Sequence, residues 1–178
     1  PEAFVSMSAE VCEQLDVRGL ICAPAVAATA TRSHNGRVLI VPSVNHSLVL
    51  PRCRAIAHHG GSGTTAAAAR AGVPSVLLWI GADQPAWAKK VAELGIGAGH
   101  RLSSTTRDDL LRLLRTVLTR QYSQRARELA AQMEGPADSV RTAATLIERT
   151  IVAARNRRSA RGAAAGRRRG GARRAAEE

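Results

Sequence analysis

Short apolar runs alternate with helical patterns up to about residue 101. The runs are four to six residues long and are bounded by glycine, proline or polar residues, a pattern that predicts buried strands. They lie at 19–22, 37–41, 55–58, 75–80 and 96–100. Apolar residues at helical spacing predict helices at 5–17, 64–71 and 84–94, and a short helix or turn at 48–54. Beyond residue 101 the pattern is helical only, at 105–118, 122–133 and 138–154.

Strands that alternate with helices predict an α/β fold with a Rossmann-like, doubly wound parallel sheet, followed by C-terminal helices. In such sheets ligands bind beyond the carboxyl ends of the strands. We single out the strand that ends at His58, because a glycine-rich turn and a helix follow it directly.

The charge divides the chain into two regions, 1–151 and 152–178. The net charge is +12, and residues 152–178 hold nine of the arginines but only two glutamates. We expect 1–151 to fold and this basic tail, rich in Arg, Ala and Gly, to be disordered. The tail could bind RNA, DNA or an anionic membrane through phosphate, or be a solvated terminus. We favour the solvated terminus and expect no nucleic-acid partner, because no recognition motif accompanies the arginines.

The remaining composition narrows the class of protein further. Aromatic residues make up only 2% of the chain, which argues against nucleic-acid modules that stack bases on aromatic rings. Cys12, Cys22 and Cys53 form no metal-binding or disulfide pattern, so we expect a reducing cytoplasm and no metal. No apolar run is long enough to predict a transmembrane segment.

Candidate chemistry gathers in the turn His58-His59-Gly60-Gly61-Ser62-Gly63-Thr64-Thr65. Its glycines allow a sharp turn and the close approach of a ligand, and the helix after it offers free N–H groups to an anion. His59, Thr64 and Thr65 can add donors. The pattern is neither a P-loop nor a dinucleotide fingerprint. It indicates a phosphate site, with a capped strand-to-helix turn as the alternative.

A longer series of blocks is more specific. It comprises Val44-Asn45-His46, Leu50-Pro51, 55–65, 70–74 (Arg-Ala-Gly-Val-Pro) and 82–85 (Ala-Asp-Gln-Pro). This series resembles the C-terminal, donor-binding domain of family 1 glycosyltransferases of the GT-B fold. Bacterial glycopeptide and glycolipid enzymes are the most similar, and sterol glucosyltransferases are more distant. The resemblance runs from about Arg37 to about Glu148.

The resemblance implies a role for each matching position. The diphosphate of a UDP- or dTDP-sugar would be held by His59 and by the helix start at Gly63-Thr64-Thr65. The turn residues Gly60, Gly61 and Ser62 belong to the same nucleotide-sugar site. Asp83 and Gln84 would bind sugar hydroxyls. The backbone near Val44 would meet the base, and His46 the base and ribose. Without the resemblance, simpler roles are open for three residues. Asp83 could be a helix cap, His46 a surface histidine and Trp87 a core residue.

The resemblance also implies a reaction and its limits. The chain would be the donor half of an inverting enzyme that moves a hexose onto a hydroxyl of a lipid, sterol or natural-product aglycone, with the nucleotide sugar as substrate and no cofactor. The catalytic base would lie in an N-terminal acceptor domain, which this chain lacks. The first strand of the donor-binding domain is also expected to fall outside the chain. Because the acceptor domain and the base are missing, we expect the chain alone to be inactive. The alternative is a non-catalytic, truncated remnant or nucleotide-sugar-binding fragment.

Overall fold

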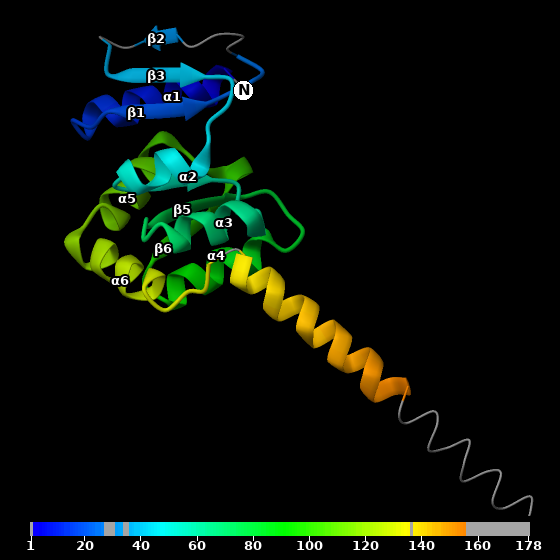
Figure 1. Ribbon diagram of the computed structural model, residues 1–178. Helices are drawn as coiled ribbons and strands as arrows, with labels where there is room; N and C mark the ends of the chain where they lie inside the picture. Colours follow the sequence, from blue (N-terminus) through cyan, green and yellow to red (C-terminus); the bar gives the residue numbers. More distant parts are fainter. Residues whose placement is uncertain (1, 27–30, 34–35, 136, 156–178) are drawn as a thin grey trace, which may run out of the picture. The chain divides into compact units, whose positions relative to one another are not determined.

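The computed structural model describes residues 2–26, 31–33, 36–135 and 137–155. The chain forms two compact units, Pro1–Met133 and Glu134–Glu178 (Figure 1). The proposed basic tail therefore lies almost wholly outside the described residues.

The first unit alternates strands and helices as predicted. Its strands are β1 (Gly19–Cys22), β2 (Thr31–Ser33), β3 (Val38–Val41), β4 (Ile56–His58), β5 (Ser75–Trp79) and β6 (Gly97–Arg101). Its α-helices are α1 (Glu2–Gln14), α2 (His46–Val49), α3 (Ser62–Arg70), α4 (Gln84–Glu93), α5 (Arg107–Val117) and α6 (Arg120–Ala130). Short 3₁₀ turns lie at Leu50–Arg52 and Leu102–Ser104.

The strands form two three-stranded sheets in the described residues. One has the order β1-β3-β2, in which β1 and β3 are parallel and β2 is antiparallel to β3. The other has the order β4-β5-β6 and is parallel throughout. The predicted α/β architecture is confirmed, but β2 was not predicted. The polar segment Thr31–Ser33 has no apolar alternation that could have revealed it.

Strand β5 is the centre of the second sheet and is buried on both faces. Val76 and Leu78 pack with residues of α1 and α5, whereas Leu77 packs with α3, α4 and α6. Helices thus cover both faces, and this explains the unbroken apolar sequence of the strand.

Helix α1 connects the two sheets. Its Val5 and Ala9 pack against Val38 and Ile40 of β3, while Val11 belongs to the cluster around Val76 of β5. The helix also packs against α5. A single helix therefore contributes to the cores of both sheets.

Local sequence signals mark the ends of the helices. Gly72 and Gly95 follow α3 and α4 with φ of +67° and +66°, in the left-handed region that glycine tolerates. Thr106 and Asp109 form a reciprocal capping box at the start of α5. The bonds from Thr106 hold the pKa of the Asp109 carboxyl well below its usual range.

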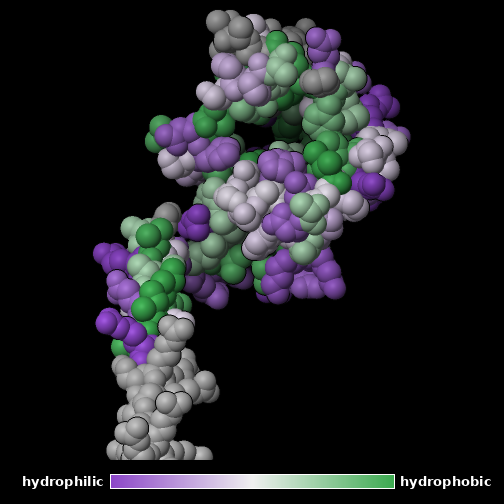
Figure 2. Space-filling model, turned by 90° about the vertical axis from the view of Figure 1, so that its right-hand side faces the viewer, coloured by the Kyte–Doolittle hydropathy of each residue, from purple (hydrophilic) through white to green (hydrophobic). Residues whose placement is uncertain are grey.

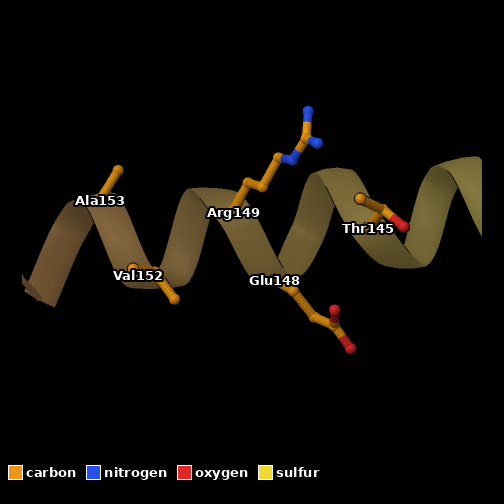
Figure 3. A pocket seen from close by; sticks show the side chains of 5 residues that line it. All are labelled: Thr145, Glu148, Arg149, Val152 and Ala153. Carbon is orange, nitrogen blue, oxygen red and sulfur yellow. The ribbon is translucent and has the colours of Figure 1, made fainter.

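The described part of the second unit is a helix over residues 137–155, yellow to orange in Figure 1. Its larger apolar side chains are all exposed: Val140, Leu146, Ile147, Ile151 and Val152. A surface hollow along it is lined by Thr145, Glu148, Arg149, Val152 and Ala153. Figure 3 shows these side chains pointing to opposite sides of one helix, so they do not enclose a ligand. Among the described residues, no helix is long and apolar enough to span a membrane.

Candidate functional site

The turn after β4 depends on glycine at position 60. Gly60 has φ of +90°, and a Cβ there would lie 3.3 Å from both Leu77 Cδ2 and Gln84 Cβ. A larger residue would be strained by its backbone and crowded by both neighbours. The close packing places the β4–α3 turn directly against the first residue of α4, so the loops after β4 and β5 adjoin.

His58 supports this turn from inside. The Gly60 N–H donates a hydrogen bond to His58 Nδ1 over 3.1 Å, so the proton of the neutral ring is on Nε2. Burial lowers the pKa of His58 to about 4, with further lowering by the charges of His59 and His46. His58 is therefore a neutral residue that organises the turn. The sequence marked it only as the end of a strand.

His59 is exposed and lies over Gly61. A Cβ on Gly61 would come within 2.7 Å of His59 Nε2, so the ring occupies the space that glycine leaves. The rings of His58 and His59 are almost perpendicular, with centroids 6.4 Å apart. This arrangement keeps the exposed imidazole beside the start of α3.

Helix α3 begins without a side-chain cap. Gly61 is its N-cap residue and has no side chain to bond the first N–H groups. The N–H groups of Ser62, Gly63 and Thr64 precede the first hydrogen bond within the helix, which runs from Thr65 N to Gly61 O. A Cβ at Gly63 would meet no heavy atom within 4 Å. The helix start therefore leaves these three N–H groups open beside free space, with the partial positive charge of a helix N-terminus.

The two threonines of the turn differ in their surroundings. Thr65 is only 5% exposed, and its hydroxyl donates to the carbonyl of Gly61 over 2.9 Å. This bond gives the Thr65 hydroxyl a structural role within the turn. Thr64 is half-buried beside the open helix start.

The loop after β5 holds Asp83 and Gln84. Ala82 has φ of +55°, a strained value for a residue with a side chain. The Asp83 carboxylate makes no capping bond to α4, although Asp83 is the N-cap residue. It accepts a hydrogen bond from Trp87 Nε1 instead, over 2.9 Å. The reading of Asp83 as a helix cap is therefore wrong for its side chain.

Trp87 is a functional candidate that the sequence interpretation missed. We expected a core residue, but its side chain is on the surface, with 38% of the residue exposed. The spacing of four residues between Asp83 and Trp87 on a helix was the available signal. Gln84 is also fixed, because its Oε1 accepts bonds from the N–H groups of Ile80 and Gly81 at 2.8 and 3.3 Å.

Val44 and His46 lie at the start of α2. The side chain of Asn45 caps this helix by accepting a bond from Ser47 N over 3.0 Å. His46 is exposed, and its charge contributes to the lowered pKa of His58, so α2 begins near the β4–α3 turn. Within the described residues, no cluster of three or more His, Cys, Asp or Glu side chains could hold a metal ion.

The candidate site residues therefore lie in three segments, which follow β3, β4 and β5. A family model described as the C-terminal domain of proteins like erythromycin biosynthesis protein CIII matches residues 7–148. The chain is 44% identical over 151 residues to an uncharacterized glycosyltransferase of Mycobacterium tuberculosis, a match covering 85% of this chain and 36% of that protein. It is 38% identical over 151 residues to the vancomycin aglycone glucosyltransferase of Amycolatopsis orientalis, covering 72% and 37%.

A solved structure agrees with these relatives. The spinosyn rhamnosyltransferase SpnG in complex with thymidine diphosphate matches with a TM-score of 0.63 and 26% identity, over 78% of this chain and 39% of that one. The chain thus spans little more than a third of the length of its relatives. It belongs to the GT-B glycosyltransferase family, and the part that it matches is the C-terminal domain.

Proposed function

We propose that this chain binds the nucleoside-diphosphate sugar of a glycosyltransferase at the β4–α3 turn. The observation that carries the proposal is the contact of Gly60 with Leu77 and Gln84. This contact brings an uncapped helix start, an exposed imidazole and a carboxylate-bearing loop together at the carboxyl end of a parallel sheet. Ligands of α/β proteins bind at this edge.

The diphosphate binds at the start of α3. The N–H groups of Ser62, Gly63 and Thr64 and the hydroxyl of Thr64 donate to phosphate oxygens, and His59 adds an N–H donor. Donors fixed in this way also stabilise the negative charge that develops on a departing diphosphate. The bound thymidine diphosphate of SpnG supports this class of ligand.

The sugar binds beside the loop after β5. Asp83 accepts hydrogen bonds from sugar hydroxyls, and the amide nitrogen of Gln84 donates to them. The nucleoside lies toward α2, where the backbone at Val44 meets the base and His46 meets the base and ribose. The hydrogen bonds that fix the Gln84 carbonyl and the Asp83 carboxylate orient both groups before a ligand arrives.

The reaction is transfer of a hexose, with inversion, from a UDP- or dTDP-sugar to a hydroxyl of a lipid, sterol or natural-product aglycone. The vancomycin aglycone glucosyltransferase supports a natural-product acceptor. We assign the catalytic base and the acceptor contacts to an N-terminal acceptor domain, present in cis or as a partner. The chain by itself is therefore expected to bind the donor without transferring sugar.

Calorimetric titration tests the binding site. Thymidine diphosphate, uridine diphosphate and thymidine are titrated into the full chain and into His59→Ala. The loss of a charge-assisted bond to phosphate should weaken diphosphate binding by about ten- to a hundredfold. Thymidine, which has no phosphate, should be unaffected. His100→Ala is the control, because His100 lies on β6, two strands from β4.

The same titration can refute the assignment. Equal losses for thymidine and thymidine diphosphate in His59→Ala would mean that His59 does not contact phosphate. Unchanged binding of both ligands would mean that the turn is only a strand-to-helix connection. Asp83→Ala should weaken binding of the sugar-bearing donor and leave nucleoside-diphosphate binding nearly unchanged. The reason is that Asp83 contacts a sugar hydroxyl in the proposal.

A further inference from the structure

The helix over residues 137–155 has one continuous apolar side. Val140, Ile147 and Ile151 are spaced by seven and four residues, which places them on one side of an α-helix. We call this side the apolar stripe, and its members are Val140, Ala144, Leu146, Ile147, Ile151 and Ala154. At about 100° per residue the stripe covers an arc of roughly 160°, with Ala144 and Leu146 at its edges. An arc of this width is typical of a helix that packs its apolar side against an apolar partner.

The polar residues of this helix leave the stripe uninterrupted. Thr150 lies within the same arc, but its hydroxyl donates to the carbonyl of Leu146 over 2.8 Å and so needs no other partner. The charged residues all lie outside the arc: Asp138, Arg141, Glu148, Arg149 and Arg155. Because Asp138 forms an ion pair with Arg141, the charges that remain on the polar side are two arginines and one glutamate. The helix is therefore amphipathic, with a small positive excess.

The apolar stripe is open to solvent. Its four larger side chains, those of Val140, Leu146, Ile147 and Ile151, are each more than half exposed. In the lower left of Figure 2 hydrophobic side chains form a green band along this helix, with hydrophilic purple side chains beside it. Helix α5 of the first unit, by contrast, buries its leucines and Val117 in a core. A continuous apolar surface that the described residues leave exposed indicates a binding surface.

The charge next to the stripe indicates the kind of partner. In the sequence, the basic tail at 152–178 overlaps the end of this helix and holds nine arginines but only two glutamates. An apolar helix side with arginines beside it is typical of segments that lie on a bilayer, because acyl chains take up the apolar side and lipid phosphates attract the arginines. The arginines by themselves favoured a solvated terminus, since no motif accompanied them. The exposed stripe is such an accompanying feature, and it changes this preference.

We propose that the helix over 137–155 and the basic tail bind the surface of a membrane that contains anionic phospholipids. The helix lies parallel to the bilayer, with the apolar stripe among the acyl chains. Arg149, Arg155 and the further arginines of the tail contact lipid phosphates. Two signals of this kind are needed together, because a single one gives only marginal and reversible membrane binding.

Other partners fit only one of the two features. A nucleic acid would attract the arginines but leave the apolar stripe exposed. A second copy of the chain would cover the stripe but add a second tail with nine arginines, and like charges repel. An anionic bilayer accommodates both features at once. The inference uses no residue of the proposed donor site, so it stands independently of the proposed function.

Co-sedimentation of the full chain with lipid vesicles tests the proposal. One set of vesicles is phosphatidylcholine alone, and the other contains roughly one third phosphatidylglycerol. The anionic vesicles should bind the chain about tenfold more tightly or better, because each arginine near an anionic surface strengthens binding about fivefold. Salt at about 0.5 M should remove most of this difference by screening the charges.

Two double variants separate the apolar stripe from the charge. Ile147→Glu with Ile151→Glu places two carboxylates on the stripe, and Thr142→Glu with Thr145→Glu places two on the polar side. Both variants lower the net charge by the same amount, and all four positions are exposed, so folding should be retained. The stripe variant should bind anionic vesicles about tenfold more weakly or worse than the parent, and the control at most about threefold more weakly.

Several results would overturn the proposal. One is a parent chain that does not sediment with either kind of vesicle. Equal losses in the two double variants would show that charge alone holds the chain and that the stripe does not enter the bilayer. A dimer of the parent that the stripe variant abolishes, without vesicle binding, would show that a second copy covers the stripe. Binding to RNA or DNA that is tighter than binding to anionic vesicles would assign the arginines to nucleic acid.

Discussion

The indole N–H of Trp87 donates a hydrogen bond to Oδ2 of Asp83 over 2.9 Å, one helical turn back along α4. The other carboxylate oxygen, Oδ1, has no protein partner in the part of the chain that the structure describes. Trp87 thus fixes the carboxylate while leaving one oxygen for a ligand. In the proposed site Trp87 is a positioning residue for sugar binding and does not touch the diphosphate.

Trp87→Phe should weaken binding of a dTDP-sugar by about three- to tenfold, because the ring is kept and the hydrogen bond is lost. Thymidine diphosphate should bind unchanged. Calorimetry with both ligands measures the difference. Trp79→Phe is the matched control, since the Trp79 ring contacts the Arg101 guanidinium instead. Equal loss for both ligands in Trp87→Phe would contradict a role confined to Asp83.

Gly60→Ala and Gly63→Ala should change stability in opposite directions. Alanine at position 60 meets a positive φ and atoms at 3.3 Å, which should cost about 1–3 kcal/mol of unfolding free energy. Alanine at position 63 meets nothing within 4 Å and should gain about 0.5–1 kcal/mol from helix propensity. Urea denaturation measures both changes.

The same pair of variants separates fold from binding. The methyl group of Gly63→Ala fills open space at the helix start, so thymidine diphosphate should bind more weakly to a more stable protein. Tight diphosphate binding by Gly63→Ala would mean that phosphate does not approach this position.

Thr65→Val should destabilise the chain by about 1 kcal/mol, because it removes the buried bond from the hydroxyl to the Gly61 carbonyl. Thr64→Val should leave stability nearly unchanged and weaken diphosphate binding. Thermal unfolding and calorimetry together distinguish the two threonines. The assignment fails if the effects of the two substitutions are reversed.

Stability should fall in acid as His58 is forced to take up a proton. Burial lowers its pKa to about 4 in the folded chain, against the ordinary histidine value of 6.5. Between these values the unfolded chain binds the proton and the folded chain does not, so unfolding is favoured as the pH falls. His58 does not reduce the free energy of unfolding above pH 6.5. Toward pH 4 it lowers this free energy by at most about 3 kcal/mol.

Urea denaturation of the parent chain and of His58→Asn at several pH values measures this contribution. The parent should lose stability between pH 6.5 and 4, and the variant should show a smaller slope over that range. His59→Ala is the control, because it removes one of the charges that lower the His58 pKa and should reduce the slope only partly. An identical slope in His58→Asn would show that other groups cause the acid loss.

The amino-acid sequence by itself determined where the chain forms most strands and helices. The apolar run Ser75–Trp79, the glycines that end α3 and α4, and the Thr106–Asp109 capping box all act through residues close in sequence. Such local signals can be recognised in a sequence because strand alternation, helix spacing and the conformational freedom of glycine need no distant partner. The glycine-rich turn between β4 and α3 was predictable for the same reason.

Only the tertiary structure decided what each side chain of the turn can do. Thr64 and Thr65 are adjacent and chemically identical, yet packing buries Thr65 and commits its hydroxyl to Gly61. Trp87 looked like a core residue because its spacing fits an apolar face, but among the described residues no element covers that side of α4 enough to bury it. Burial and strand pairing depend on neighbours far along the chain, and these neighbours exist only once the sheets and helices have packed.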